Sequence, residues 1–126
     1  MDHQAADLTA PVVLVPPVSG EDDNGDPIAP VFADWQDWYE QILSQWFTQD
    51  PDAKNAWCPG WPEHPLAAAA VDALWRAWEV ANLDPGPSMA TFLAHQCFPI
   101  MRELTEGGTF AGCSADRHRP TAKPLP

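Results

Sequence analysis

Apolar residues recur at steps of three and four positions between residues 35 and 47, the spacing that places side chains on one face of an α-helix. The stripe consists of Trp35, Trp38, Tyr39, Ile42, Leu43, Trp46 and Phe47. Asp34 stands where an N-cap would accept hydrogen bonds from the first turn, and Asp50-Pro51 disfavours helical backbone much beyond Gln49. The pattern therefore predicts a first helix that begins after Asp34 and ends near Gln49.

A second stripe with helical spacing follows Pro65, in an alanine-rich segment. Proline is tolerated at the first helical position, where no backbone bond is lost, so we expect a helix from Pro65 to about Asn82. Its predicted buried positions are Val71, Leu74, Trp75, Trp78 and Ala81. The same periodicity turns Asp72, Arg76 and Glu79 toward solvent, with Asp72 and Arg76 spaced for an i,i+4 ion pair.

A third helix is predicted to begin with Ser88 as its N-cap and to end at Gly107-Gly108. Its inward positions are expected to be Met89, Phe92, Leu93, Cys97, Ile100, Met101 and Leu104. Pro99 removes the backbone bond to His95, which predicts a kink or two short helices. This region contains no run of alternating β-branched residues, so the expected fold class is all-α, a small bundle of three to four helices.

Charge and proline divide the 126 residues into three parts, of which the middle one carries the helical periodicity. We expect residues 1–31 to be a disordered, acidic, proline-rich leader, residues 32–113 a helical, tryptophan-rich domain, and residues 114–126 an irregular, basic, proline-rich tail. The chain has 18 acidic residues against 6 Lys and Arg, a net charge of −12. That charge has the wrong sign for a phosphate backbone, so direct nucleic-acid binding is not expected.

Three cysteines, Cys58, Cys97 and Cys113, are an odd number and too few for the disulfide framework of a small secreted domain. The first residues lack the basic and apolar regions of a signal peptide, and no apolar run is long enough for a membrane span. We therefore expect a cytoplasmic protein that has no membrane partner.

A proline-rich loop places Cys58 six positions before His64, and Cys113 and His118 form a similar pair after the last predicted helix. Zn²⁺ binds two thiolates and two imidazoles tetrahedrally, so these four residues are a candidate structural zinc site. His95, on the predicted third helix, is an alternative ligand in place of either histidine. The spacings differ from those of zinc fingers, so a simpler interpretation stays open, in which Cys58 packs in the core and His64 caps a helix.

Cys58 is also a candidate nucleophile, with His64 or His95 as its base and Glu63 as the group that orients the base. The N-terminus of the second helix would lower the pKa of this thiol. The sequence contains no glycine-rich oxyanion turn, nucleophile elbow, phosphate-binding loop or dinucleotide fingerprint. A small thiol- or metal-dependent enzyme that uses Cys58 and His64 is therefore the second hypothesis for the function.

Trp57 and Trp61 lie on the proline-rich loop, where partial exposure would let a partner bury them as anchors. The tryptophans expected in the core are Trp35, Trp38, Trp46, Trp75 and Trp78. The leading hypothesis for the function is a non-enzymatic domain that binds another protein, and the acidic leader would favour a basic partner. A third hypothesis is an acidic DNA mimic that occupies the basic groove of another protein.

The order of these motifs resembles an actinobacterial family, domain-of-unknown-function family 4913, over about residues 32–118. The resemblance is carried by Trp57, Cys58, Pro59, Trp61, His64, Pro65, Leu74 to Glu79, His95, Phe110 and Cys113. Phe92-Leu93 and Thr109 depart from the family pattern, which tends to have tryptophans and a proline at these positions. The family has no established activity, so the resemblance implies no specific reaction or ligand. It does imply an accessory protein of a mobile element, such as a plasmid, a conjugative element or a phage.

Overall fold

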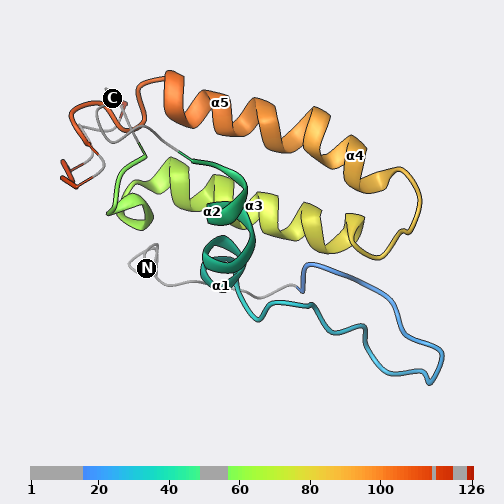
Figure 1. Ribbon diagram of the computed structural model, residues 1–126. Coiled ribbons are helices and arrows are strands. Elements are labelled where there is room, and N and C mark those ends of the chain that lie inside the picture. Colours follow the sequence, from blue (N-terminus) through green and yellow to red (C-terminus); the bar gives the residue numbers. More distant parts are fainter. Residues whose placement is uncertain (1–15, 49–56, 115, 121–124) are drawn as a thin grey trace, which may run out of the picture.

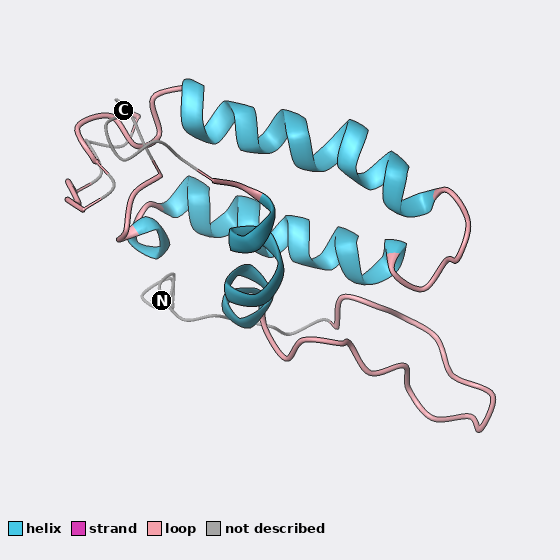
Figure 2. Cartoon of the chain, viewed as in Figure 1, coloured by secondary structure: helices cyan, strands magenta, loops and turns pink. Residues whose placement is uncertain are grey.

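The computed structural model describes residues 16–48, 57–114, 116–120 and 125–126. Over these residues the chain forms three helical rods connected by irregular segments, with no strand among them (Figures 1 and 2). The first rod contains α1 (Trp35–Trp38), a π-helical segment (Tyr39–Leu43) and α2 (Ser44–Trp46). The second rod is α3 (Pro65–Ala81), which follows a single 3-10 turn (Trp61–Glu63). The third rod contains α4 (Ser88–Phe92), a second π-helical segment (Leu93–Cys97) and α5 (Phe98–Glu106).

The three rods pack around one apolar core, and the predicted all-α fold is confirmed with three helices. α4 and α5 run alongside α3 and antiparallel to it, while α1 and α2 lie across α3 (Figure 1). Each rod contributes a large side chain that is almost or completely buried, namely Trp38, Trp75 and Phe92. The rings of Trp38 and Trp78 pack at 6.3 Å between centroids, which joins α1 to α3. Aromatic packing therefore supplies much of the contact between the first two rods.

Local sequence signals locate two of the three helix starts. Asp34 Oδ1 accepts a hydrogen bond from the backbone N–H of Asp37 at 2.8 Å, so Asp34 is the predicted N-cap. The second helix begins at Pro65, as the proline predicts. The predicted N-cap at Ser88 is wrong, because Ser88 is the first residue of α4 and its hydroxyl donates to the carboxylate of Asp84 instead.

Two features of the helices differ from the prediction. The first rod ends at Trp46, not near Gln49, because the backbone becomes extended at Phe47. Trp46, predicted to lie in the core, is consequently 42% exposed at the end of its helix. Pro99 does not divide the third rod, since it lies in the first turn of α5 directly after the π-helical segment Leu93–Cys97. The π-helical segment, whose turns are wider than those of an α-helix, lies where the kink or helix break was predicted.

Glu79 of α3 is buried, with 2% of its surface exposed, and the prediction that it faces solvent is wrong. Its carboxylate accepts hydrogen bonds from the backbone N–H groups of Val31 at 2.8 Å and Phe32 at 2.9 Å. The indole N–H of Trp75 donates to it at 3.1 Å. Three donors replace the water that the carboxylate loses on burial, and they join the segment before α1 to the middle of the molecule.

The described part of the predicted leader, residues 16–31, is irregular and contains one antiparallel backbone pairing, between Glu21 and Pro27. Val18 in this segment is buried. Residues 1–15 lie outside the described residues, so the disorder of the leader stays a prediction.

The described residues of the tail are irregular, and they contain a backbone turn between Ser114 and Arg117. Ser114 and Arg117 exchange backbone hydrogen bonds of 2.9 and 3.2 Å, which reverses the chain after α5. The reversal brings His118 against Cys58 and Glu63, which precede α3, and Arg119 against Cys113. None of the helices formed by the described residues combines the length and apolar character that crossing a membrane requires.

Candidate metal centre

Two consecutive turns hold Cys58 and His64 at the N-terminal end of α3. The backbone N–H of Trp61 donates to the carbonyl of Cys58 at 3.1 Å, and the N–H of His64 donates to the carbonyl of Trp61 at 3.0 Å. Pro65 then begins the helix with its φ angle already fixed by the ring. Cys58 is completely buried in this arrangement, and His64 is 2% exposed.

Cys113 reaches the same place from the end of α5 through a turn in which its N–H donates to the carbonyl of Phe110 at 2.9 Å. Gly112, inside this turn, has φ +85°, a left-handed conformation that glycine adopts without strain. A Cβ atom at Gly112 would also lie 2.4 Å from Cδ of Arg119. The glycine therefore allows the returning tail to pass close to the turn that holds Cys113.

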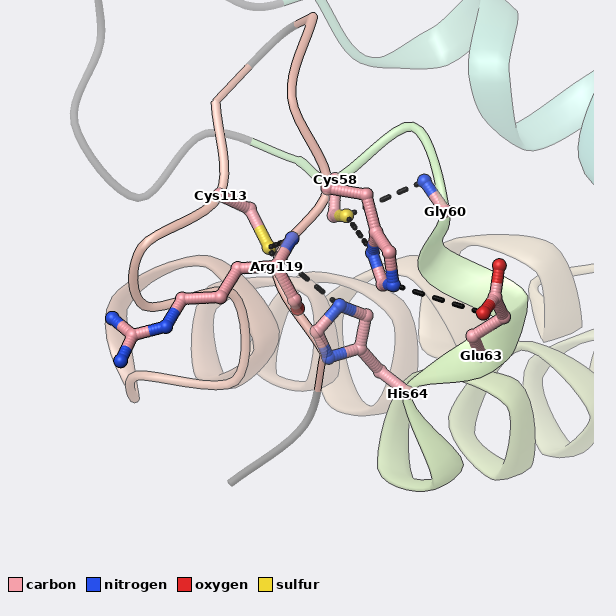
Figure 3. A network of polar contacts seen from close by, with 7 residues as sticks. Cys58, Gly60, Glu63, His64, Cys113 and Arg119 are labelled. Carbon is pink, nitrogen blue, oxygen red and sulfur yellow. Dashed lines mark hydrogen bonds and ion pairs between the residues drawn. The ribbon is translucent and has the colours of Figure 1, made fainter.

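Cys58, His64, Cys113 and His118 form one cluster, in which the potential ligand atoms all lie within 4.8 Å of one another (Figure 3). Sγ of Cys58 is 3.0 Å from Nδ1 of His118, and Sγ of Cys113 is 3.6 Å from Nε2 of His64. The structure thus brings together the four residues predicted as zinc ligands. His95, the predicted alternative ligand, is exposed on the third rod and is not part of the cluster.

Backbone N–H groups donate to both sulfur atoms of the cluster. The N–H of Gly60 lies 3.3 Å from Sγ of Cys58, and the N–H of Arg119 lies 3.3 Å from Sγ of Cys113 (Figure 3). Donors of this kind stabilise negative charge on sulfur, which is the form in which cysteine binds a metal. Both loops therefore provide a ligand together with a group that supports it.

Glu63 and Gly60 fix the position of His118. Oε1 of Glu63 lies 3.7 Å from Nε2 of His118, whereas the other ring nitrogen, Nδ1, contacts Sγ of Cys58. Metal-ligating histidines commonly contact a carboxylate in this way through their second nitrogen. A Cβ atom at Gly60 would lie 2.7 Å from Nδ1 of His118, so the imidazole packs where any other residue would place a side chain.

The electrostatic surroundings of Cys58 and His64 favour the neutral forms of these two side chains when no cation is present. Burial, and next the neighbouring Cys113, raise the pKa of the Cys58 thiol, although the N–H of Gly60 acts in the opposite direction. Burial, and next the charge of His118, lower the pKa of His64. A neutral imidazole is ready to bind a metal, whereas the thiols must lose their protons, which a bound cation would favour.

An aromatic layer lies beneath the cluster. Phe110 packs its ring edge-on against His64 at 5.2 Å and against Trp57 at 4.8 Å. Trp57 is partly buried, and its ring stacks on Tyr39 of the first rod at 5.9 Å. Trp61 is only 6% exposed, so the predicted partial exposure is wrong for this residue. Both loop tryptophans pack against the protein's own core, where they connect the cluster with α1 and its π-helical extension.

Cys58 and His64, the catalytic pair considered from the sequence, both belong to the cluster. Sγ of Cys58 contacts His118, and His64 contacts Sγ of Cys113. In both contacts a residue that precedes α3 meets a residue that follows α5. Sequence spacing indicates only which residues are near one another in the chain, so it does not predict these two contacts.

Sequence reasoning also missed the supporting roles of Gly60 and Arg119. A glycine two positions after a candidate ligand is a usable signal, because it allows both a tight turn and a close approach. Arg119 carries no such signal, since its backbone N–H, which any residue except proline would supply, makes the contact with Cys113.

Comparison with known proteins gives one positive result. No match was found among curated proteins, and none was found among solved structures. A family model described as "Domain of unknown function (DUF4913)" matches residues 32–126, a range that contains the three helical rods and all four residues of the cluster. The chain therefore belongs to the DUF4913 family.

Proposed function

We propose that this chain is a non-enzymatic protein-binding domain, stapled by a structural zinc ion bound to Cys58, His64, Cys113 and His118. The observation that carries the zinc site is a closed set of four protein donors, of which three belong to buried residues. Structural zinc sites have four protein ligands, whereas catalytic sites keep a position open for water or substrate. A closed and buried set is therefore typical of a structural ion.

The donor types and distances favour zinc over other common cations. Ca²⁺ and Mg²⁺ prefer oxygen ligands, whereas two sulfurs and two nitrogens in tetrahedral arrangement suit zinc. Metal–ligand bonds of about 2.0 to 2.3 Å in a tetrahedron would separate the ligand atoms by roughly 3.3 to 3.8 Å. The separation of 3.6 Å between Cys113 Sγ and His64 Nε2 lies within that range, and the separation of 3.0 Å between Cys58 Sγ and His118 Nδ1 lies slightly below it.

A zinc ion in this place would connect two segments that are distant in the chain. One segment precedes α3, and the other follows α5, so the ion would fix the tail onto the helical domain. Small domains have limited apolar cores, and a structural metal adds stability because its binding free energy becomes folding free energy. The ion would then also stabilise the packing of Phe110 and Trp57 beside the cluster.

The burial of Cys58 argues against the competing hypothesis of a thiol enzyme. A catalytic cysteine attacks an organic substrate that has to fit against its sulfur, and catalytic thiols are therefore partly exposed. Cys58 is completely buried, and His118 is the one member of the cluster with partial exposure. A structural metal site accounts for this arrangement, whereas a nucleophile for a substrate of that size does not.

Surface charge and exposed apolar groups support the protein-binding part of the proposal. A net charge of −12 attracts a basic partner over long distances. Large apolar side chains exposed in the described part of the chain, which could contact a partner, are Val31, Trp46, Leu66, Val80, Leu83, Phe98 and Leu125. The odd and small number of cysteines supports a reducing compartment, so we place this domain in the cytoplasm. As the sequence resemblance implies, we propose that it is an accessory protein of an actinobacterial mobile element.

Elemental analysis of the purified protein tests the zinc site. Stoichiometric zinc is expected in the unaltered chain, and its loss is expected in Cys58→Ser and in Cys113→Ser. Cys97→Ser is the matched control, because Cys97 is equally buried but lies outside the cluster. A chain purified under metal-replete conditions without bound metal, or two cluster variants that retain full zinc, would refute the site.

Affinity capture from a native host extract tests the proposed partner. A tagged chain should retain a basic protein at low salt and release it at high salt, because screening weakens attraction between surface charges. A variant with Glu21→Gln and Asp23→Asn, two exposed acidic residues, should retain less of that protein. Binding that is independent of salt and of these charges would contradict an electrostatically guided partner.

A further inference from the structure

We infer that Cys58 and Cys113 are an oxidation site, at which a hydroperoxide converts the two metal-binding sulfurs into an intramolecular disulfide and thereby releases the metal. The inference rests on the proposed zinc site and adds a means of regulation to it. The cluster would then connect the segment before α3 with the segment after α5 in two forms, one through a bound metal ion and one through a disulfide bond.

The positions of the two sulfurs carry the inference. Both belong to a set of ligand atoms that lie within 4.8 Å of one another, and a disulfide requires about 2.05 Å between sulfur atoms. Cys58 lies before the 3-10 turn and Cys113 lies after α5, so both are on turns and neither is within a helix. Turn backbone can shift, and each side chain can rotate about its first torsion angle, without disruption of a helix.

The surroundings of the sulfurs favour Cys58 as the first to react. Its neighbour His118 has a side chain that is 25% exposed, whereas His64, beside Cys113, is 2% exposed. A small oxidant such as hydrogen peroxide can therefore approach from the His118 side, while a bulky disulfide reagent is excluded by the burial of Cys58. Both sulfurs accept a backbone N–H at 3.3 Å, from Gly60 at Cys58 and from Arg119 at Cys113, so the order of reaction depends on the access beside His118.

The reaction balances with hydrogen peroxide as the oxidant. The Cys58 thiolate attacks one peroxide oxygen, a sulfur–oxygen bond forms, the oxygen–oxygen bond breaks, and the departing hydroxide takes a proton from solvent. The Cys113 thiolate then attacks the sulfur of Cys58, the disulfide bond forms, and the sulfur–oxygen bond breaks to give a second hydroxide, which is also protonated. Overall, two thiolates lose two electrons, and one peroxide becomes two water molecules.

Cys97 provides an internal comparison. It is completely buried in the third rod, it is not part of the cluster, and burial raises the pKa of its thiol to about 11. Cys97 is not a member of the cluster, so the geometry that brings the sulfurs of Cys58 and Cys113 together does not include its sulfur. Peroxide should therefore leave Cys97 reduced under conditions that oxidise the pair.

The experiment treats the purified, zinc-loaded protein with a small excess of hydrogen peroxide. Intact mass under non-reducing conditions should decrease by the mass of two hydrogen atoms, and a chromophoric chelator should detect released zinc with the same time course. Peptide mapping should identify a bridge between Cys58 and Cys113, and a dithiol reductant should restore metal binding. Cys97→Ser should behave as the unaltered chain, whereas Cys58→Ser should form no internal bridge.

Several outcomes would overturn the inference: a bridge that includes Cys97, a disulfide between two chains, sulfinic acid as the main product, or release of zinc without a disulfide. Peptide mapping of the unaltered chain gives a result even where a cysteine variant fails to fold. Failure of the proposed function is distinguishable, because a chain without zinc would refute the metal site, while the same mapping would still show whether the cysteine pair bridges.

Discussion

The carboxylate of Glu79 accepts the indole N–H of Trp75 one helical turn earlier, at 3.1 Å between Oε2 and Nε1. The same carboxylate accepts the backbone N–H groups of Val31 and Phe32, which lie just before α1. One buried acidic side chain thus joins α3 to the segment that enters the first rod. The ring of Phe32 also packs against Trp78 at 5.6 Å, so polar and aromatic contacts fix this segment together.

Glu79→Ala should destabilise the protein by about 2–4 kcal/mol, because it removes the acceptor of the buried indole N–H of Trp75 and of two part-buried backbone N–H groups. Chemical denaturation followed by circular dichroism measures this loss. Glu106→Gln is a suitable control, since Glu106 is exposed at the end of α5 and its substitution should have little effect on the free energy of unfolding. Equal effects of the two substitutions would show that the carboxylate of Glu79 does not have the proposed structural role.

Trp75→Phe should cost more stability than Trp38→Phe. Both indoles are completely buried, but Trp75 Nε1 donates to Glu79, whereas Trp38 Nε1 has no hydrogen-bond partner among the described residues. Both substitutions remove apolar area, and only the first also removes a hydrogen bond to a charged group, which is worth about 1.5–3 kcal/mol. The free energies of unfolding of the two variants give the comparison, and a larger loss for Trp38→Phe would contradict it.

Gly60→Ala should weaken zinc binding by about 10–100-fold, as the loss of a supporting contact does in other metal sites. The new Cβ would lie 2.7 Å from Nδ1 of His118 and would displace the imidazole. Competition with a chromophoric chelator measures the affinity. In the control Gly86→Ala, the new Cβ would meet the exposed carboxylate of Asp84 at 3.2 Å, so zinc binding should not change.

The metal-free protein and the zinc-bound protein should depend on pH in opposite ways above neutrality. Burial raises the pKa of Cys58 above its ordinary value of 9.0, so the folded state holds this proton more tightly than the unfolded state. Stability of the metal-free protein should therefore fall as pH rises through about 9. Zinc affinity should instead increase with pH, because ligand thiols must be deprotonated. Thermal unfolding with and without a chelator tests this difference.

The pKa of His64 predicts a second loss of stability, on the acidic side. Burial lowers its folded-state pKa below the ordinary value of 6.5, so the unfolded state binds the proton more readily. Stability of the metal-free protein should thus decrease as pH falls through about 6.5. Replacement by glutamine should remove this acidic dependence from thermal unfolding curves. A His64→Gln variant with the same acidic slope would show that another group is responsible.

Features that depend on nearby residues could be predicted from the sequence. Pro65 and Asp34 marked helix starts, and the spacing of Asp72 and Arg76 predicted the ion pair that the structure shows at 3.2 Å. Each of these signals acts within about one helical turn, where propensity and capping operate.

The buried state of Glu79 was not predictable in this way, because two of its three donors lie 47 and 48 positions earlier in the chain. Helical periodicity describes one helix and cannot show what covers its outer face. The residue types of the metal cluster were recognisable for their chemistry, but the contact of Cys58 with His118 spans 60 positions. That contact depends on how the tail folds back after α5.

The antiparallel arrangement of α3 with α4 and α5 would have a mechanical consequence in the proposed zinc-bound protein. These rods are joined at one end by the turn at Asp84–Pro87 and at the other end by the cysteine and histidine cluster, so together they make a closed ring (Figure 1). A protease that cuts the turn would open the ring without separating its halves. Only the loss of both connections would let the two rods part, which gives the molecule tolerance to a single break in its backbone.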